Sequence, residues 1–408
     1  MYLLRKCEWS CLLLLSIMIL SCEESSSPEV EKTAGGLIRS ELIHNYSAEE
    51  MGQLLAMLGI PDPPSVQTSF RAVKLIYYSP DVEGEMQRLS GAIIFPVDDL
   101  EHPVLSMQHG TVTRRDEVAS VDPLNSSAGI TALLTASLGY ITLVPDYAGY
   151  GDSNDHHPYM HGELLANSVI DMIRAAQRYC DEEDIKRNDQ LFLGGYSEGG
   201  YATLATQQLM ETDYPDEFNL TAVAPMAGPY DLQATARLVL EGSEYTWPAY
   251  IGFMFVAYDQ IYGLKNLDQV FVAPYNEQIT AMYSGNLSFF EINNQLPLGI
   301  ENLIRSEFRE SFLEGTEHVF SDKFIENSLL SWQPNAPLRF IHGTQDATVP
   351  YSVAVATVNA LVDGGAENVE LIGIPGATHE TAGMPAVMEM LAWFSTFDSQ
   401  FGTNLIPI

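Results

Sequence analysis

The sequence predicts an α/β protein built on a mostly parallel sheet of eight strands, with helices on both faces. Two apolar runs lie close together within residues 73–95, and later apolar runs alternate with stretches of helical periodicity. Apolar residues make up 46% of the 408 residues and charged residues only 18%, which is typical of a folded globular chain. These observations exclude a disordered or fibrous protein.

The first 21 residues have the features of a secretory signal peptide. Two basic residues precede residues 11–20, an apolar run with a single polar residue that is too short to span a bilayer. Residues 19–22 (ILSC) resemble the lipobox of bacterial lipoproteins, which implies that Cys22 carries a lipid anchor. We therefore expect an exported outer-membrane lipoprotein of the bacterial cell envelope, with residues 22–39 as a flexible tether. An ordinary signal peptide cleaved nearby is the alternative.

The charge balance excludes nucleic acid as the expected partner. Acidic residues outnumber basic ones by 54 to 19, giving a formal net charge of −35, whereas binding to phosphates needs clustered basic side chains. We expect neutral or cationic partners and contact with a membrane only through the lipid anchor; no oligomeric state is predicted. Without the signal peptide and Cys22, Cys180 is the remaining cysteine, so no internal disulfide is expected.

The expected elements follow in order along the chain. Residues 40–58 are predicted to form a short amphipathic helix that ends before a proline cluster. The expected strands are residues 73–78, 90–95, 104–108, 140–144, 191–194, 221–225, 339–342 and 369–374. The expected later helices lie near residues 126–138, 161–180, 198–211, 352–362 and 384–396.

A segment of about 100 residues interrupts this alternation after the sixth expected strand. Residues 232–335 contain aromatic clusters at helical spacing, such as residues 247–251 (WPAYI) and 253–255 (FMF), and no strong strand. A structureless loop of this length would be unusual, so we predict a helical cap or lid inserted into the core, which then comprises residues 40–231 and 336–408. We expect most of its aromatic residues to form the cap's own core and a minority to line a pocket.

The sharpest motif is GYSEGG at residues 195–200, which follows the expected strand at 191–194 and opens a helical run. A serine on such a strand-to-helix turn is exposed at the carboxyl edge of the sheet, and its neighbours must be small. The G-x-S-x-G pattern alone is weak, but the strand–turn–helix context makes it specific. We predict that Ser197 is the catalytic nucleophile; a glycine-rich turn without chemistry is the alternative.

A serine hydroxyl needs a general base and an acid that orients this base. In this architecture both follow the nucleophile along the chain, each after a later strand. Asp346 comes just beyond the expected strand at 339–342, and His379 just beyond the one at 369–374. We therefore predict Asp346 as the acid and His379 as the base.

The other histidines show no comparable pattern. His342 precedes the acid, and we expect it to support that turn. His156, His157 and His161, with two nearby aspartates, could form a metal cluster, but no second ligand group with metal spacing accompanies them. We expect neither a metal nor a cofactor.

Acyl transfer also requires hydrogen-bond donors for the oxyanion. The backbone N–H of Glu198, the residue after the nucleophile, is one expected donor, and the loop after the third expected strand supplies the other. This loop reads MQHGT at residues 107–111, and we predict Thr111, with Gly110 as the alternative. A Glu198 carboxylate facing the oxyanion would raise the barrier, so we expect its side chain to point into the supporting helix and pair there.

Together these motifs resemble the α/β-hydrolase superfamily over residues 65–231 and 336–397. Residues 145–151 (PDYAGYG), residues 157–161 (HPYMH), the GYSEGG motif and the predicted cap are similar to the secretory lipase family of fungal lipase-A-type enzymes and bacterial relatives. The resemblance implies an α/β-hydrolase fold and hydrolysis of carboxylic esters, with a lid over the acyl pocket.

The leading interpretation is a secreted serine esterase or lipase that cleaves a small-molecule or lipid ester through a Ser-Asp-His triad and an acyl-enzyme. A serine peptidase of the prolyl-oligopeptidase type shares G-x-S-x-G-G, but no large amino-terminal propeller precedes the catalytic domain. A binding protein on an inactive hydrolase fold is disfavoured because every triad and oxyanion position is filled. The aromatic cap predicts a bulky apolar acyl or alcohol group.

Overall fold

A computed structural model describes residues 32–58 and 66–397 of the chain. The predicted signal peptide at 1–21, Cys22 and most of the predicted tether lie outside the described residues. Residues 37–39, which we placed at the end of the tether, belong to the first strand. Within the part of the chain that is described, no helix has the length and apolar character needed to cross a membrane.

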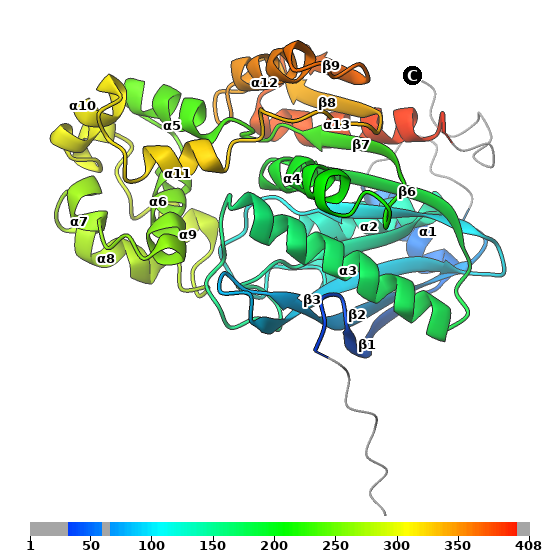
Figure 1. Cartoon of the computed structure of the whole chain (residues 1–408). Helices are drawn as coiled ribbons and strands as arrows, with labels where there is room; N and C mark the ends of the chain where they lie inside the picture. Colours follow the sequence, from blue (N-terminus) through cyan, green and yellow to red (C-terminus); the bar gives the residue numbers. More distant parts are fainter. Residues whose placement is uncertain (1–31, 59–65, 398–408) are drawn as a thin grey trace, which may run out of the picture. The chain divides into compact units, whose positions relative to one another are not determined.

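The core is a single nine-stranded sheet (Figure 1) in the order β1-β2-β3-β5-β4-β6-β7-β8-β9. Pairs among β4 to β9 are parallel, and β1, β2 and β3 add an antiparallel edge. The strands are β1 (Leu37–Tyr46), β2 (Ser69–Pro80), β3 (Met86–Val97), β4 (His102–Gln108), β5 (Ile141–Pro145), β6 (Arg187–Tyr196), β7 (Leu220–Met226), β8 (Leu338–Gly343) and β9 (Val369–Ile374). The predicted mostly parallel sheet is confirmed, with one strand more than the eight expected.

The additional strand corrects the prediction of one helix over residues 40–58. Residues up to Tyr46 pair with β2 as the edge strand β1, and a shorter helix, α1 (Ala48–Met57), follows. Ser47 caps α1 and Glu50 completes a capping box. This Ser-x-x-Glu pattern was readable in the sequence and marks where the helix starts. The chain before it is extended because its backbone completes hydrogen bonds with β2, which local periodicity does not reveal.

Helices cover both faces of the sheet, as predicted. One layer contains α3 (Gly162–Glu182), α4 (Glu198–Asp213) and α12 (Tyr351–Asp363), and the other contains α1, α2 (Ser127–Ser137) and α13 (His379–Phe394). Strands β4 and β5 are buried along their whole length, as expected for parallel strands covered on both sides. Because β4 to β9 run in the same direction, the loops that follow them meet at one edge of the sheet.

The segment between β7 and β8 is helical, as predicted, and we call residues 232–335 the helical insertion. Its elements, on the left in Figure 1, are α5 (Leu232–Glu241), α6 (Pro248–Tyr262), α7 (Leu267–Val270), α8 (Tyr275–Met282), α9 (Phe289–Asn293), α10 (Ser306–Glu314) and α11 (Ser321–Glu326). The ring of Phe255 lies at the centre of an aromatic core. Its neighbours are Phe271, Phe308, Phe320 and Phe324, with ring centroids 5.0–6.0 Å away.

Candidate active site

Ser197 lies at the turn between β6 and α4 with φ of 61° and ψ of −121°. This left-handed φ is uncommon for a residue with a side chain and marks a strained turn. The turn packs tightly against β4, since a Cβ added at Gly199 would lie 2.1 Å from the carbonyl oxygen of Gln108. Glycine is therefore required here, and the turn holds the Ser197 side chain at the carboxyl edge of the sheet.

Ser197, His379 and Asp346 are joined by hydrogen bonds although they follow three different strands. Ser197 Oγ lies 2.9 Å from His379 Nε2, and His379 Nδ1 lies 2.6 Å from Asp346 Oδ2. A carboxylate can only accept, so Nδ1 carries the proton and Nε2 is left to accept the proton of the serine hydroxyl. His379 is the first residue of α13, where Thr378 caps the helix and fixes the start of its backbone.

Asp346 is held as a carboxylate by the turn after β8. Burial raises the pKa of this group, but hydrogen bonds from His342 and His379 outweigh burial and lower the pKa to about 2. Asp346 Oδ1 also accepts hydrogen bonds from the backbone N–H groups of Thr348 and Val349, both at 2.9 Å. His342 Nε2 lies 2.9 Å from the Val349 carbonyl, so this histidine contacts the turn as expected.

The loop after β4 lies beside the nucleophile. A Cβ added at Gly110 would be 3.7 Å from Ser197 Cβ and 3.1 Å from the Tyr196 carbonyl oxygen. The next residue, Thr111, places its Oγ1 3.0 Å from the phenol oxygen of Tyr159. Glu198 begins α4, so its backbone N–H has no partner within the helix. The structure thus brings the loop of residues 110 and 111 and the start of α4 together beside Ser197.

The Glu198 side chain is fully buried and forms a hydrogen bond that sequence reasoning missed. Its Oε1 lies 2.5 Å from Nε2 of His157, and His157 Nδ1 lies 2.9 Å from the Ala148 carbonyl oxygen. The expectation that Glu198 pairs within its supporting helix is wrong, because the partner comes from the loop before α3. The HPYMH run was the only signal in the sequence, and it does not indicate which residue His157 contacts.

Two of the three histidines that could form a metal cluster, His157 and His161, have other partners in the structure. His157 pairs with Glu198, and His161 caps α3 by accepting from the backbone N–H of Leu164. Burial lowers the pKa of His161 to about 4, so it is neutral at physiological pH. Over residues 32–58 and 66–397, no group of three or more His, Cys, Asp or Glu side chains is placed to hold a metal ion.

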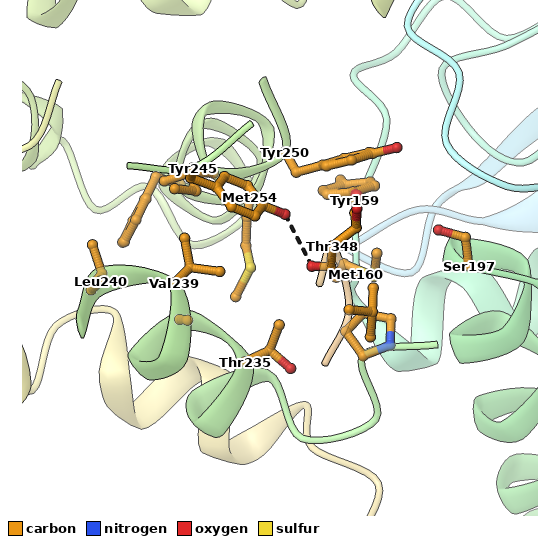
Figure 2. A pocket seen from close by; sticks show the side chains of 15 residues that line it. Tyr159, Met160, Ser197, Thr235, Val239, Leu240, Tyr245, Tyr250, Met254 and Thr348 are labelled. Carbon is orange, nitrogen blue, oxygen red and sulfur yellow. Dashed lines mark hydrogen bonds between the residues drawn. The ribbon is translucent and has the colours of Figure 1, made fainter. Parts of the chain in front are cut away.

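An apolar pocket lies between Ser197 and the helical insertion (Figure 2), and Tyr245 closes one side by donating to the Thr348 carbonyl at 3.1 Å. Three aromatic residues of the helical insertion line the pocket, Tyr245, Tyr250 and Phe255, which is the minority that we expected. The lining residues are Tyr159, Met160, Ser197, Pro229, Thr235, Ala236, Val239, Leu240, Tyr245, Tyr250, Ile251, Met254, Phe255, Thr348 and Val349.

Solved structures with this architecture include ester hydrolases. A protein of Legionella pneumophila assigned as a hydrolase is 26% identical with a TM-score of 0.80, covering 90% of this chain and 100% of that one. The rice cell wall degrading esterase LipA of Xanthomonas oryzae is 26% identical with a TM-score of 0.76, covering 90% of this chain and 97% of LipA. Candida antarctica lipase A shares the fold, with 15% identity and a TM-score of 0.68. The match covers 92% of this chain and 84% of that one.

Comparison at the level of sequence gives the family. No curated protein sequence matches the chain. The family model for secretory lipases matches residues 125–400, more than half of the chain, and this range contains Ser197, Asp346 and His379. With its α/β-hydrolase fold, the chain is a carboxylic ester hydrolase that belongs to the secretory lipase family.

Proposed function

We propose that the protein is an exported serine esterase that forms an acyl-enzyme on Ser197. The supporting observation is the continuous hydrogen-bond chain Ser197–His379–Asp346 at the wall of an apolar pocket. His379 Nε2 removes the hydroxyl proton as Ser197 Oγ attacks the ester carbonyl carbon. Asp346 orients His379 in the required tautomer and stabilises the imidazolium that forms.

The reaction then proceeds in two halves. The tetrahedral intermediate carries its negative charge on the former carbonyl oxygen, which accepts hydrogen bonds from the backbone N–H groups of Thr111 and Glu198. The C–O bond to the alcohol breaks as the His379 imidazolium returns a proton to the leaving oxygen. Water attacks the acyl-enzyme with His379 again as base, and the carboxylic acid leaves Ser197 free.

The helical insertion acts as a cap that binds the apolar part of the substrate. Residues of α5 and α6 line the pocket together with Ser197, and the lining side chains are mainly apolar. An apolar chain transferred from water to this wall gains roughly 0.8 kcal/mol for each buried CH₂ group. We expect turnover to increase with the length of the acyl chain until the pocket is filled.

The amino-terminal segment directs the protein to the cell envelope. Cys22 follows an apolar run and a small residue in the lipobox-like ILSC, and its thiol is the proposed site of lipid attachment. Fatty-acid labelling of the full chain tests this: wild type is labelled and found with membranes, whereas Cys22→Ser is unlabelled. Equal labelling of both proteins would contradict the anchor and leave the ester hydrolase unaffected.

The test of the function is the initial rate on p-nitrophenyl esters from acetyl to palmitoyl. Ser197→Ala should lower kcat by roughly 10⁴- to 10⁶-fold without unfolding the protein, since the Oγ provides chemistry and not packing. Ser168→Ala is the matched control, because the hydroxyl of this buried serine donates to the Leu164 carbonyl within α3 and Ser168 does not line the pocket. Turnover that survives in Ser197→Ala contradicts the proposal, and activity on amides in place of esters indicates a peptidase.

A further inference from the structure

The buried pair of His157 and Glu198 stands beside the triad but has no part in the reaction derived above. Glu198 has no solvent exposure and follows the nucleophile directly. Among the described residues, its Oε2 has no hydrogen-bond partner. Burying an ionisable pair with one oxygen unsatisfied costs stability relative to an apolar replacement. The pair therefore needs an explanation other than stability.

The proton count of this pair follows from its two neighbours. His157 Nδ1 faces the Ala148 carbonyl, which can only accept, so Nδ1 carries a proton. A proton must also lie between Nε2 and Glu198 Oε1, because two acceptors 2.5 Å apart would repel each other. Whether this proton sits on nitrogen or on oxygen, the two side chains together carry no net charge.

The surroundings make that neutrality important. The rings of Tyr147, Tyr150, Tyr159 and Phe253 have centroids 4.5–6.0 Å from the His157 ring, so water does not screen the pair. Burial first, and then the Glu198 charge, raise the pKa of Tyr159 well above its usual value. An uncompensated charge on Glu198 would therefore act on Tyr159, which lines the pocket and contacts Thr111.

We propose that His157 is a positioning residue that neutralises the Glu198 carboxylate and so protects the oxyanion site from a negative charge. The inference rests on the proposed function, because the oxyanion forms only if Ser197 attacks the ester. Glu198 then supplies its backbone N–H to the oxyanion while its own side chain is compensated. The same pair connects the start of α4 to the loop that carries Tyr159, and Tyr159 in turn contacts Thr111.

The decisive experiment is a double-mutant comparison. His157→Gln keeps a side chain that can donate to Glu198 but removes the compensating charge, and kcat should fall roughly 100-fold, the scale of losing one oxyanion donor. Adding Glu198→Gln to this variant removes the uncompensated carboxylate, and kcat should recover at least about tenfold. His161→Gln, at the other end of the same run, is the matched control and should leave kcat within about twofold of wild type.

Two further readouts separate charge compensation from a structural role. The KM for a neutral ester should change less than about threefold in His157→Gln, since the charge matters when the oxyanion forms. Phenylboronic acid, which forms a negatively charged tetrahedral adduct on a catalytic serine, should bind about 100-fold more weakly to His157→Gln and recover in the double variant. The inference is overturned if kcat falls in His157→Gln and does not recover in the double variant, provided that both variants melt at the wild-type temperature. It is also overturned if His157→Gln has the wild-type kcat.

Proton NMR of the wild-type enzyme keeps the inference testable if His157→Gln does not fold. A low-field proton shared by His157 and Glu198 should be present in wild type and disappear in Glu198→Gln. It should remain in Ser197→Ala, which separates the pair from the triad. Absence of this proton overturns the inference, whereas turnover in Ser197→Ala overturns the proposed function itself.

Discussion

Two buried histidine–carboxylate pairs lie near Ser197, and their second contacts differ. In the pair His379–Asp346 the imidazole presents its other nitrogen to the Ser197 hydroxyl. In the pair His157–Glu198 the other nitrogen faces the Ala148 carbonyl. His379 can therefore accept the proton of the Ser197 hydroxyl that attacks the substrate. His157 has no such contact with Ser197, because its two nitrogens face Ala148 and Glu198.

The carboxylates differ as well. Asp346 accepts from two backbone N–H groups and two histidines, whereas Glu198 has one partner among the described residues. A carboxylate with several donors remains ionised when buried, and this suits a group that must stabilise an imidazolium. The comparison shows that the neighbours of a His–carboxylate pair, and not its residue types, determine what it can do.

Among changes within the two pairs, the largest effect is expected from an acid-to-amide exchange in the first pair. Asp346→Asn should lower kcat by roughly 10⁴-fold, because an amide N–H facing His379 Nδ1 forces the proton onto Nε2, which can then no longer accept from Ser197. Steady-state kinetics on a p-nitrophenyl ester measures this loss. A variant that keeps a tenth of the wild-type kcat would show that His379 does not depend on Asp346.

A change that touches neither pair separates chemistry from substrate binding. Ala236 lines the pocket from α5, so Ala236→Trp should fill the pocket and lower turnover of the palmitoyl ester roughly 100-fold relative to the acetyl ester. Leu238→Trp is the control, since Leu238 lies on the same helix but is 40% exposed and does not line the pocket. Equal losses on both esters would place the acyl chain elsewhere.

Acid stability should distinguish wild type from Asp346→Asn. The pKa of Asp346 is lowered from 3.8 to about 2 on folding, so this group stabilises the folded state above pH 3.8 and the contribution is lost as pH falls toward 2. The shift corresponds to about 2 kcal/mol. The free energy of unfolding measured in urea should decrease between about pH 5 and about pH 2.5. This decrease should be roughly 1.5 kcal/mol smaller in Asp346→Asn, because the contribution is only partly lost at about pH 2.5. Identical decreases would mean that Asp346 does not gain its charge stabilisation on folding.

The smallest effect is expected from the same acid-to-amide exchange in the second pair. Glu198→Gln keeps a hydrogen bond to His157 and a pair without net charge, so kcat should fall by less than about tenfold. Measured beside Asp346→Asn, this variant tests whether the two pairs perform different work. Losses of kcat of similar size in the two variants would contradict the conclusion that the two pairs have different roles.

The strand–helix order of the core could be predicted because apolar periodicity is a local property. The eight expected strands correspond to β2 through β9, and the helical nature of residues 232–335 follows from aromatic residues at helical spacing. The helix expected over residues 40–58 was wrong because Leu37–Tyr46 gains its hydrogen bonds from β2, a partner more than 20 residues away. An edge strand such as β1 depends on pairing with its neighbour, and the hydrophobic pattern of the strand itself does not indicate that pairing.

Sequence alone placed Ser197, Asp346 and His379 each after a strand, and a parallel sheet gathers such positions at one edge. The family also follows from the sequence, since the family model for secretory lipases matches residues 125–400. Tertiary structure alone decided that Glu198 meets His157, 41 residues earlier in the chain, and which aromatic residues of the helical insertion face the pocket. Both depend on where loops and helices pack against the sheet, and packing is set by contacts between segments that have no fixed spacing in the sequence.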